Sequence, residues 1–371
     1  MPEAPTPSDT RIGLALSGGG FRATLYHCGA LIRLNELGYL PKLDRITSVS
    51  GGSITSARLA ARWRKLQFDA NGVAGNLDQE VIQPLRKFCR QTLDTRVIAG
   101  GLIPFTKSAT ERLIEAYDTQ LLDGMTLDRL PQRPDFIFQA TNLQTGRGFR
   151  FSRKRVADYL VGEIRDTSKF KVAQAVAASS AFPPVLSPVA IKVKQSDWSD
   201  MEGTEFFGQL SFMQTLNLTD GGVYDNLGLE RIDRFGTILC SDAGKPFTHG
   251  PTFGPFSPKQ ILRGLDIAMD QARARRTSAL FAMQRFTGQK LGYWGIDMGK
   301  TLEPAAGLLP RAPEVVKKIT ALRTRLNEFT PTEQGLLINW GYVCCDERMR
   351  SYVAKGGPPP AGLPVPDVPL S

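Results

Sequence analysis

The sequence predicts an α/β fold with parallel strands, because two strand–turn–helix units follow one another near the start of the chain. In the first unit, an apolar run over 12–16 ends at the three glycines 18–20, which allow the backbone angles of a tight turn. Apolar residues at helical spacing follow over 22–37. The second unit pairs a strand over 45–49 with a helix over 54–66. Strand–helix–strand connections are nearly always right-handed, so both turns should lie at the carboxyl ends of parallel strands and share one crevice.

The second turn has the sequence Ser48-Val49-Ser50-Gly51-Gly52, which is close to the G-x-S-x-G nucleophile elbow. In that motif, a strained strand-to-helix turn exposes a serine hydroxyl at a helix N-terminus. Gly52 supplies the small residue that close packing of helix and strand needs, whereas Ser48 replaces the usual first glycine. A serine that caps a helix would fit the same residues. This motif alone therefore leaves catalysis and capping open.

The first turn also has two interpretations. Gly18-x-Gly20-x-x-Ala23 matches the dinucleotide fingerprint G-x-G-x-x-G/A, but that fingerprint needs an acidic residue at the end of the second strand. Asp44 precedes that strand instead, and no Gly-Lys-Ser/Thr follows to make a P-loop. The other use for a row of backbone N–H groups is to hold an oxyanion.

The rest of the chain continues the alternation of strands and helices. Alternating or continuous apolar runs predict further strands over 135–141, 148–152, 189–193, 209–218, 235–241 and 293–298. Helical spacing predicts helices over 172–180, 257–286, 313–327 and 332–350. The apolar stripe of the long helix over 257–286 predicts that it covers one face of the sheet.

A third motif, Asp220-Gly221-Gly222, follows the strand over 209–218 and exposes a carboxylate beside free backbone. The motifs G-G-G-F-R, S-x-S-G-G and D-G-G in this order resemble the patatin-like phospholipases over roughly 11–245, as in bacterial patatin-like lipid acyl hydrolases. The first of them also resembles the animal cytosolic phospholipases. The resemblance implies a three-layer α/β/α patatin-like fold with a mainly parallel central sheet and helical insertions.

The resemblance further implies a serine lipid acyl hydrolase of the phospholipase A or lysophospholipase type that works through a Ser50–Asp220 dyad. Asp220 would take the proton of Ser50, and backbone N–H groups would stabilise the oxyanion. The expected donors are Gly18, Gly19, Gly20 and Gly51. The residues expected to shape the elbow and the Asp-Gly-Gly turn are Ser48, Gly52, Gly221 and Gly222. Arg22 is expected either to hold the lipid phosphate or to brace the loop, and the scheme needs no metal or cofactor.

The choice of base rests partly on the scarcity of histidine, since the chain has only His27 and His249. Ser50, Asp220 and His249 follow the chain order of α/β-hydrolase triads. That fold, however, places several strands before its nucleophile, and only two are predicted before Ser50. The dyad is therefore favoured, because a carboxylate in a water-poor site has its pKa raised into a range useful for a base.

Composition narrows the function classes. The net charge of +10 favours anionic membranes or nucleic acid, but the basic clusters show neither interleaved aromatic residues nor a nucleic-acid module, so no nucleic-acid partner is expected. The positive charge and an apolar segment over 97–105 predict transient contact with anionic membranes. The five cysteines form no C-x-x-C pair, and the first residues lack a signal-peptide pattern. These features predict a cytoplasmic protein, peripheral at the inner membrane face.

The expected organisation is a flexible tail over 1–10, one catalytic domain over 11–350 and a proline-rich disordered tail over 351–371. Within the domain, 67–130 is predicted to be a helical insertion over the catalytic face, and 257–350 to supply C-terminal helices. Two other functions stay open. One is a membrane-degrading antiphage effector that uses the same chemistry and has a nucleotide activator of the cyclic type. The other is a non-catalytic lipid or nucleotide binder, and the sequence leaves the oligomeric state undefined.

Overall fold

The computed structural model describes residues 9–93, 108–183, 186–249, 258–298 and 305–371. Its strands are β1 (Ile12–Leu16), β2 (Arg45–Val49), β3 (Asp135–Asn142), β4 (Arg147–Ser152), β5 (Val156–Asp158), β6 (Gly162–Ile164), β7 (Val189–Lys192), β8 (Trp198–Ser199), β9 (Thr215–Asp220), β10 (Thr237–Asp242) and β11 (Lys290–Gly295). Its α-helices are α1 (Gly20–Glu36), α2 (Gly51–Arg62), α3 (Gln83–Phe88), α5 (Ala109–Tyr117), α6 (Val172–Ser180), α7 (Leu210–Met213), α8 (Gly222–Asp225), α9 (Pro258–Thr287), α10 (Pro313–Thr320) and α11 (Pro331–Arg348).

One mixed sheet forms the centre of the molecule. Its middle is the parallel series β11-β10-β1-β2-β3. Beyond β3 the pairing becomes antiparallel through β4, β5, β6 and β8, while β9 pairs with β3 and with β7. In β1, Leu14 lies opposite Ile46 of β2 and Leu239 of β10, so the first strand is enclosed on both edges. The turns after β1 and β2 therefore lie at the same edge of the sheet, as the sequence predicts.

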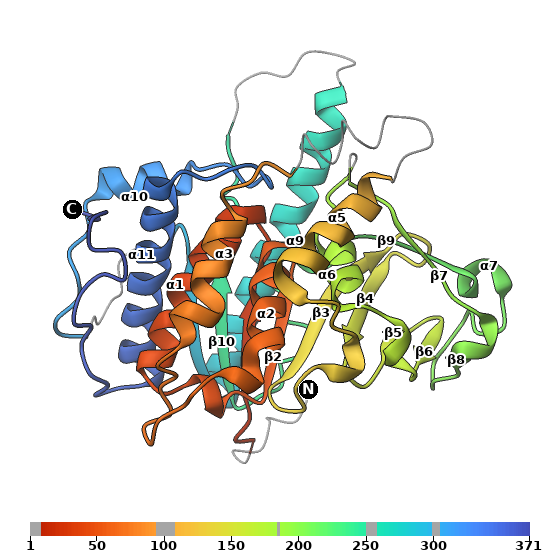
Figure 1. Cartoon of the computed structure of the whole chain (residues 1–371), viewed down its shortest axis with the longest axis horizontal. Helices are drawn as coiled ribbons and strands as arrows, with labels where there is room; N and C mark the ends of the chain where they lie inside the picture. The colour runs from red at the N-terminus through yellow and green to blue at the C-terminus, as the bar shows by residue number, and fades with distance from the viewer. Residues whose placement is uncertain (1–8, 94–107, 184–185, 250–257, 299–304) are drawn as a thin grey trace.

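Helices and loops cover both faces of this sheet (Figure 1). On one face, Leu14 and Leu16 of β1 belong to the main core, to which α1, α2, α6 and α11 contribute. On the other face, Ala15 packs in a smaller core with Ile238 of β10 and Leu280 of α9. Burial on both faces explains why the central strands are continuous apolar runs. The predicted three-layer α/β/α fold with a parallel centre is confirmed.

Helices α1 and α11 lie unusually close together, and two glycines make this possible. A Cβ atom on Gly29 would lie 1.9 Å from the carbonyl oxygen of Ile338, and one on Gly341 would lie 1.9 Å from that of Tyr26. The backbones thus contact each other directly. This packing joins the C-terminal helix to the helix that starts at the glycine turn.

Two predicted elements are shorter than expected. The strand over 209–218 is in fact the short helix α7 followed by β9, because Met213 is buried at the end of that helix turn and the chain enters the sheet only at Thr215. The helix over 313–327 ends at Thr320. The next residues leave the helix to cover the glycine turn, where the Phe21 N–H donates to the carbonyl of Arg325.

The long helix α9 does not cover the sheet along its length. Leu280 is buried against the smaller core, but Ile261 and Phe286 are 79% and 82% exposed. In Figure 1, one end of α9 projects beyond the sheet. The prediction from the apolar stripe therefore overestimated how much of α9 packs against the sheet. The spacing of apolar residues identifies the apolar face of a helix, but it does not show what packs against that face.

The C-terminal segment 351–371 differs from the expected disorder. The Asn339 side chain donates to the carbonyl groups of Val365 and Val368, and Leu370 is fully buried. The N–H of Ala312 donates to the Leu370 carbonyl. A proline-rich segment has few backbone N–H groups that need acceptors. Hydrogen bonds from one amide side chain of α11 can therefore hold this segment against the helix.

The predicted helical insertion over 67–130 includes residues 94–107, which lie outside the described residues. Its described residues pack into the main core through Leu77, Leu85 and Leu113. Residues 1–8 of the predicted N-terminal tail and the apolar segment 97–105 lie outside the described residues. In the part of the chain that is described, no helix combines the length and the apolar character that crossing a bilayer requires.

Candidate active site

Ser50 occupies a strained turn between β2 and α2. Its φ of 51° and ψ of −119° fall in a region that residues with side chains rarely adopt. A Cβ on Gly51 would lie 2.1 Å from the Gly20 carbonyl oxygen, and one on Gly52 would lie 2.3 Å from that of Leu16. Ser50 stands at the N-cap position of α2, but its side chain makes no capping hydrogen bond. The capping interpretation is therefore wrong, and the geometry is that of a nucleophile elbow.

Other serines hold this turn in place. The Ser50 N–H donates to Ser179 Oγ at 2.9 Å, and Ser179 Oγ donates in turn to the Gln139 carbonyl at 2.6 Å. Ser48, at the place of the usual first glycine, pairs its hydroxyl with that of Ser56 at 2.6 Å. A small polar residue is thus accommodated there. The sequence prediction assigned no role to Ser179, although the segment 179–184 also resembles the patatin-like family.

Asp220 reaches the serine from the end of β9. Because β9 runs antiparallel to β3 with Asp220 opposite Ala140, the carboxylate arrives at the edge of the sheet where β2 ends. Asp220 and Ser50 are only 3% and 7% exposed. Burial raises the pKa of Asp220 to about 6, although hydrogen bonds from the Gly222 N–H and the Ser50 hydroxyl act in the opposite direction. The Gly222 bond measures 2.7 Å.

Close packing of backbone also fixes the residues of the Asp220-Gly221-Gly222 turn. A Cβ on Gly221 would lie 2.3 Å from the Gln139 carbonyl oxygen, and the Gly221 N–H donates to the Ser179 carbonyl at 3.2 Å. Ser179 therefore connects the two motifs, since it contacts the backbone on both sides. The Asp-Gly-Gly turn holds its carboxylate against the elbow.

The glycine turn presents backbone N–H groups to the same place. Gly19 and Gly20 have φ angles of 139° and 58°, and both line one cavity with Ser50. Within the described residues, the N–H groups of Gly19, Gly20 and Gly51 have no protein acceptor. The Gly18 N–H, in contrast, donates to the Asn226 carbonyl at 3.0 Å. Gly18 is therefore not one of the available donors, which corrects the predicted set.

Asn226 is a second residue that the sequence prediction missed. Its carbonyl holds Gly18, and a Cβ on Gly18 would lie 2.3 Å from its side-chain oxygen. The side chain also lines the cavity. Asn226 thus links the segment that follows the Asp-Gly-Gly turn to the glycine turn, and it explains the glycine at position 18.

Arg22 braces the structure. It is fully buried, and its guanidinium donates to the carbonyl groups of Ala243, Leu322 and Thr320 at 2.7, 3.0 and 3.3 Å. Burial lowers its pKa to about 10. Of the two predicted roles, the geometry favours loop bracing, because the side chain faces backbone and does not line the cavity.

Neither histidine is placed to serve Ser50. His27 is buried, with Nδ1 2.8 Å from Ser241 Oγ and Nε2 2.9 Å from the Ser17 carbonyl oxygen. Burial lowers its pKa to about 4, so it is neutral near pH 7. His249 is exposed, packs its ring against Phe247, and is not among the described residues that line the cavity.

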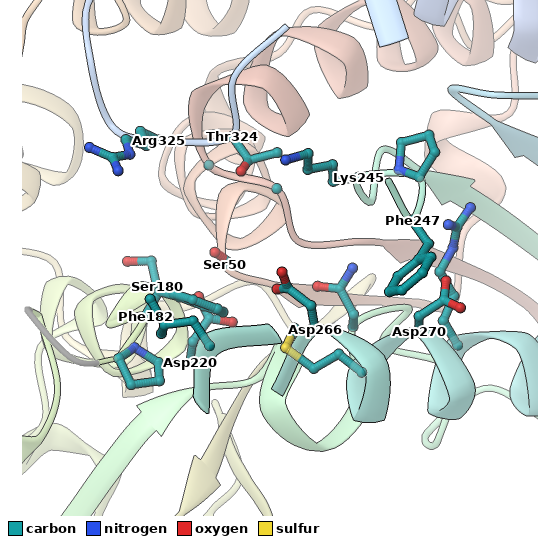
Figure 2. A pocket seen from close by; sticks show the side chains of 18 of the residues that line it. Ser50, Ser180, Phe182, Asp220, Lys245, Phe247, Asp266, Asp270, Thr324 and Arg325 are labelled. Atoms are coloured by element: carbon teal, nitrogen blue, oxygen red, sulfur yellow. The ribbon is translucent and has the colours of Figure 1, made fainter. Parts of the chain in front are cut away.

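Ser50 opens into a cavity of about 540 Å³. Figure 2 shows the serine between Thr324 and Arg325 on one side and Asp266 on the other. Apolar side chains also contribute to the wall, namely Phe182, Pro183, Leu186, Leu262, Met269 and Leu326. A strained serine, a buried carboxylate and the N–H groups of Gly19 and Gly20 at a partly apolar cavity form the arrangement that acyl transfer needs.

Known proteins resemble this chain in sequence and in fold. A family model described as Patatin-like phospholipase matches residues 14–232. The human GIVD cytosolic phospholipase A2 superimposes with a TM-score of 0.51 at 13% identity, over 90% of this chain and 58% of that chain. VipD from Legionella pneumophila gives a TM-score of 0.37 at 16% identity, over 92% of this chain and 66% of that chain.

The human structure shares the fold, and this chain spans less than two thirds of its length. A search of curated proteins returned no match. The family model covers more than half of the chain, including Ser50 and Asp220. This chain therefore belongs to the patatin-like phospholipase family.

Proposed function

We propose that this chain is a serine lipid acyl hydrolase that cleaves acyl esters of phospholipids or lysophospholipids. The observation that carries the proposal is the meeting of Ser50 with the buried Asp220 at a cavity lined by Gly19 and Gly20. Family membership supports lipid ester hydrolysis in general. The fold shared with a cytosolic phospholipase A2 is compatible with the same chemistry.

In the first half of the reaction, Asp220 accepts the hydroxyl proton while Ser50 Oγ bonds to the ester carbonyl carbon. The carbonyl oxygen becomes an oxyanion, which the N–H groups of Gly19 and Gly20 would stabilise, with Gly51 as a further donor. The C–O bond then breaks, and the leaving alcohol takes the proton from Asp220. The product of this half is an acyl ester of Ser50.

In the second half, a water molecule attacks that acyl ester and gives its proton to Asp220. The new tetrahedral oxyanion occupies the same donors, because the geometry of the carbonyl is the same. Breakdown releases the fatty acid and returns the proton to Ser50. The strained backbone of Ser50 keeps its oxygen exposed to the cavity in both halves.

The test uses Ser50→Ala with Ser278→Ala as a matched control, because Ser278 is an exposed serine on α9. We expect Ser50→Ala to abolish hydrolysis of a short-chain ester and of a phospholipid, with an unchanged circular dichroism spectrum. A fluorophosphonate probe should label Ser50, and peptide mapping of the adduct identifies the site. Labelling of another serine, or full turnover by folded Ser50→Ala, would contradict the proposal.

We also propose transient, peripheral contact with anionic membranes. The net charge is +10, and α9 exposes large apolar side chains that include Ile261 and Phe286. Apolar side chains beside basic residues favour the interface of an anionic bilayer. Vesicle binding should increase with the anionic lipid fraction and decrease with salt. Binding that responds to neither variable would remove the electrostatic part of this proposal.

A further inference from the structure

One face of α9 forms a wall of the catalytic cavity. The residues that α9 contributes there are Leu262, Arg263, Asp266, Met269, Asp270 and Arg273. Their spacing of mostly three to four residues places them on one side of the helix. In Figure 2, Asp266 and Asp270 belong to this helix, while Lys245, Thr324 and Arg325 lie across the cavity. The two sides of the cavity therefore come from segments far apart in the sequence.

Unpaired charges of opposite sign stand on these two sides. Asp266 and Asp270 are one helical turn apart, and neither makes an ion pair or a hydrogen bond within the described residues. Lys245 and Arg325 on the opposite side also lack a side-chain partner there. The cavity separates the two pairs, so they do not neutralise each other directly.

The two cations that α9 contributes to the cavity wall are already engaged. Arg273 Nε donates to Asp242 at 2.7 Å, and its other end bonds to Asp297. Arg263 stacks its guanidinium over the Phe247 ring, 3.9 Å from the ring centroid. The acidic character of the α9 side thus rests on Asp266 and Asp270.

Two like charges one turn apart on a helix repel each other, which is unfavourable unless a cation lies near both. A ligand that brings a cation to Asp266 and Asp270 and an anion to Lys245 and Arg325 would satisfy all four groups. A phospholipid with a zwitterionic headgroup has this pair of charges, a phosphate and an ammonium joined by a short linker. Its acyl ester lies on the other side of the phosphate, where Ser50 stands.

We propose that this cavity selects phospholipids with a zwitterionic headgroup, of the ethanolamine or choline type, over those with an anionic headgroup. The phosphate is held by Lys245 and Arg325, and the ammonium by Asp266 and Asp270. An anionic headgroup such as glycerol leaves both carboxylates without a counter-charge. The proposal rests on the proposed function and adds the substrate class that the site prefers.

The experiment compares kcat/KM for phosphatidylethanolamine and phosphatidylglycerol, each with the same acyl chains and each dilute in neutral detergent micelles. The neutral micelle removes the general attraction of a +10 protein to an anionic surface. Wild type should favour phosphatidylethanolamine. In Asp266→Asn/Asp270→Asn, the ratio should fall by about fivefold or more, as expected for the loss of partly exposed charge interactions. Asp266→Lys/Asp270→Lys should invert the preference.

Two further variants separate selection from general charge effects. Glu202→Gln/Asp367→Asn changes the net charge equally at exposed positions outside the cavity, and it should keep the wild-type ratio. Lys245→Gln/Arg325→Gln removes the phosphate contacts, so it should lower kcat/KM for both lipids by similar factors. The Lys245→Gln/Arg325→Gln variant also tests the proposal if Asp266→Asn/Asp270→Asn does not fold.

The outcomes distinguish this proposal from the function on which it depends. A wild type that hydrolyses a neutral short-chain ester through Ser50 but favours phosphatidylglycerol overturns the headgroup proposal alone. An unchanged ratio in folded Asp266→Asn/Asp270→Asn does the same. Ester hydrolysis that survives in Ser50→Ala overturns the proposed function, and the headgroup proposal with it.

Discussion

Two strands that follow one another in the chain, β9 and β10, end in nearly the same turn but use it differently. β9 ends in Asp220-Gly221-Gly222, and β10 ends in Asp242-Ala243-Gly244. In both turns, the N–H two residues on donates to the Asp Oδ1, at 2.7 Å for Gly222 and 2.8 Å for Gly244. Both carboxylates are buried. Local sequence and backbone geometry therefore do not distinguish them.

The surroundings of the second carboxylate oxygen distinguish the two aspartates. Asp242 Oδ2 accepts from Arg273 Nε and from the Tyr293 hydroxyl, each at 2.7 Å. This carboxylate pairs with a cation, and its charge raises the pKa of Arg273. Among the described residues, no cation pairs with Asp220, which interacts with the Ser50 hydroxyl, and burial raises its pKa to about 6. The comparison indicates that the neighbouring charge separates the two aspartates: Asp242 pairs with Arg273 of α9, whereas Asp220 is the base that we propose.

The strongest way to separate the two aspartates is to make the same change in each. Asp220→Asn should lower kcat by about 10²–10⁴-fold, because the amide keeps the shape of the carboxylate but cannot accept the serine proton. The melting temperature should change little. Turnover of a short-chain ester, with thermal unfolding in parallel, measures both. Substantial activity in folded Asp220→Asn would show that another group is the base.

Asp242→Asn should act on stability instead. The change removes the closer of the two carboxylates that pair with Arg273 and leaves only Asp297, at a site where the Arg273 side chain is 15% exposed. Breaking a buried pair in this way typically costs about 3–5 kcal/mol. Urea unfolding measures the loss, and turnover per folded molecule should remain within an order of magnitude. Asp242→Asn/Arg273→Met should recover part of the stability. A loss of turnover without a loss of stability would place Asp242 in the chemistry.

The contrast between Asp220 and Asp242 also shows which features could be predicted from the sequence. The strands and helices around Ser50 were predictable because turn, strand and helix follow one another within about fifty residues. The Asp-Gly-Gly turn was recognisable through its glycines and its order after the two other motifs. The ion pair between Asp242 and Arg273 was not, since it joins residues 31 positions apart that no local pattern relates.

The misjudged regions share a physical cause. For α9, periodicity gave the apolar face but not the extent of its contact with the sheet. For 351–371, proline content predicted disorder, whereas the Asn339 side chain supplies hydrogen bonds that hold the segment. Gly18 matched an oxyanion donor by sequence, but the carbonyl of Asn226 occupies its N–H. In each case the outcome depends on contacts with other parts of the chain, which a local sequence pattern does not show.

The pH dependence of turnover sharpens the comparison further. With a pKa of about 6, Asp220 is ionised above that pH and becomes protonated below it. A protonated carboxyl cannot accept the serine proton, so kcat/KM for a neutral ester should fall about tenfold per pH unit below pH 6. An aspartate with the ordinary value near 3.8 would keep its activity down to about pH 4. Asp242→Asn should leave this acid limb in place, and a limb near pH 4 would contradict the assigned environment of Asp220.

The smallest effect is expected from His249→Ala. His249 is exposed and packs against Phe247, and it is not among the described residues of the cavity wall. In a Ser–His–Asp triad, the histidine carries the proton, so its loss is as damaging as the loss of the serine. In the dyad, the proton passes directly from Ser50 to Asp220, and His249→Ala should keep turnover within about twofold of wild type.

The two substitutions must be measured together, because each mechanism predicts a different pair of results. The dyad predicts an active His249→Ala beside an inactive Asp220→Asn. The triad predicts that both are inactive, since Asp220 would then orient the histidine. His27 cannot take over in either case, because both of its ring nitrogens are engaged with Ser17 and Ser241. An inactive, well-folded His249→Ala would therefore replace Asp220 with His249 as the base, and Asp220 would resemble Asp242 in holding a neighbour in position.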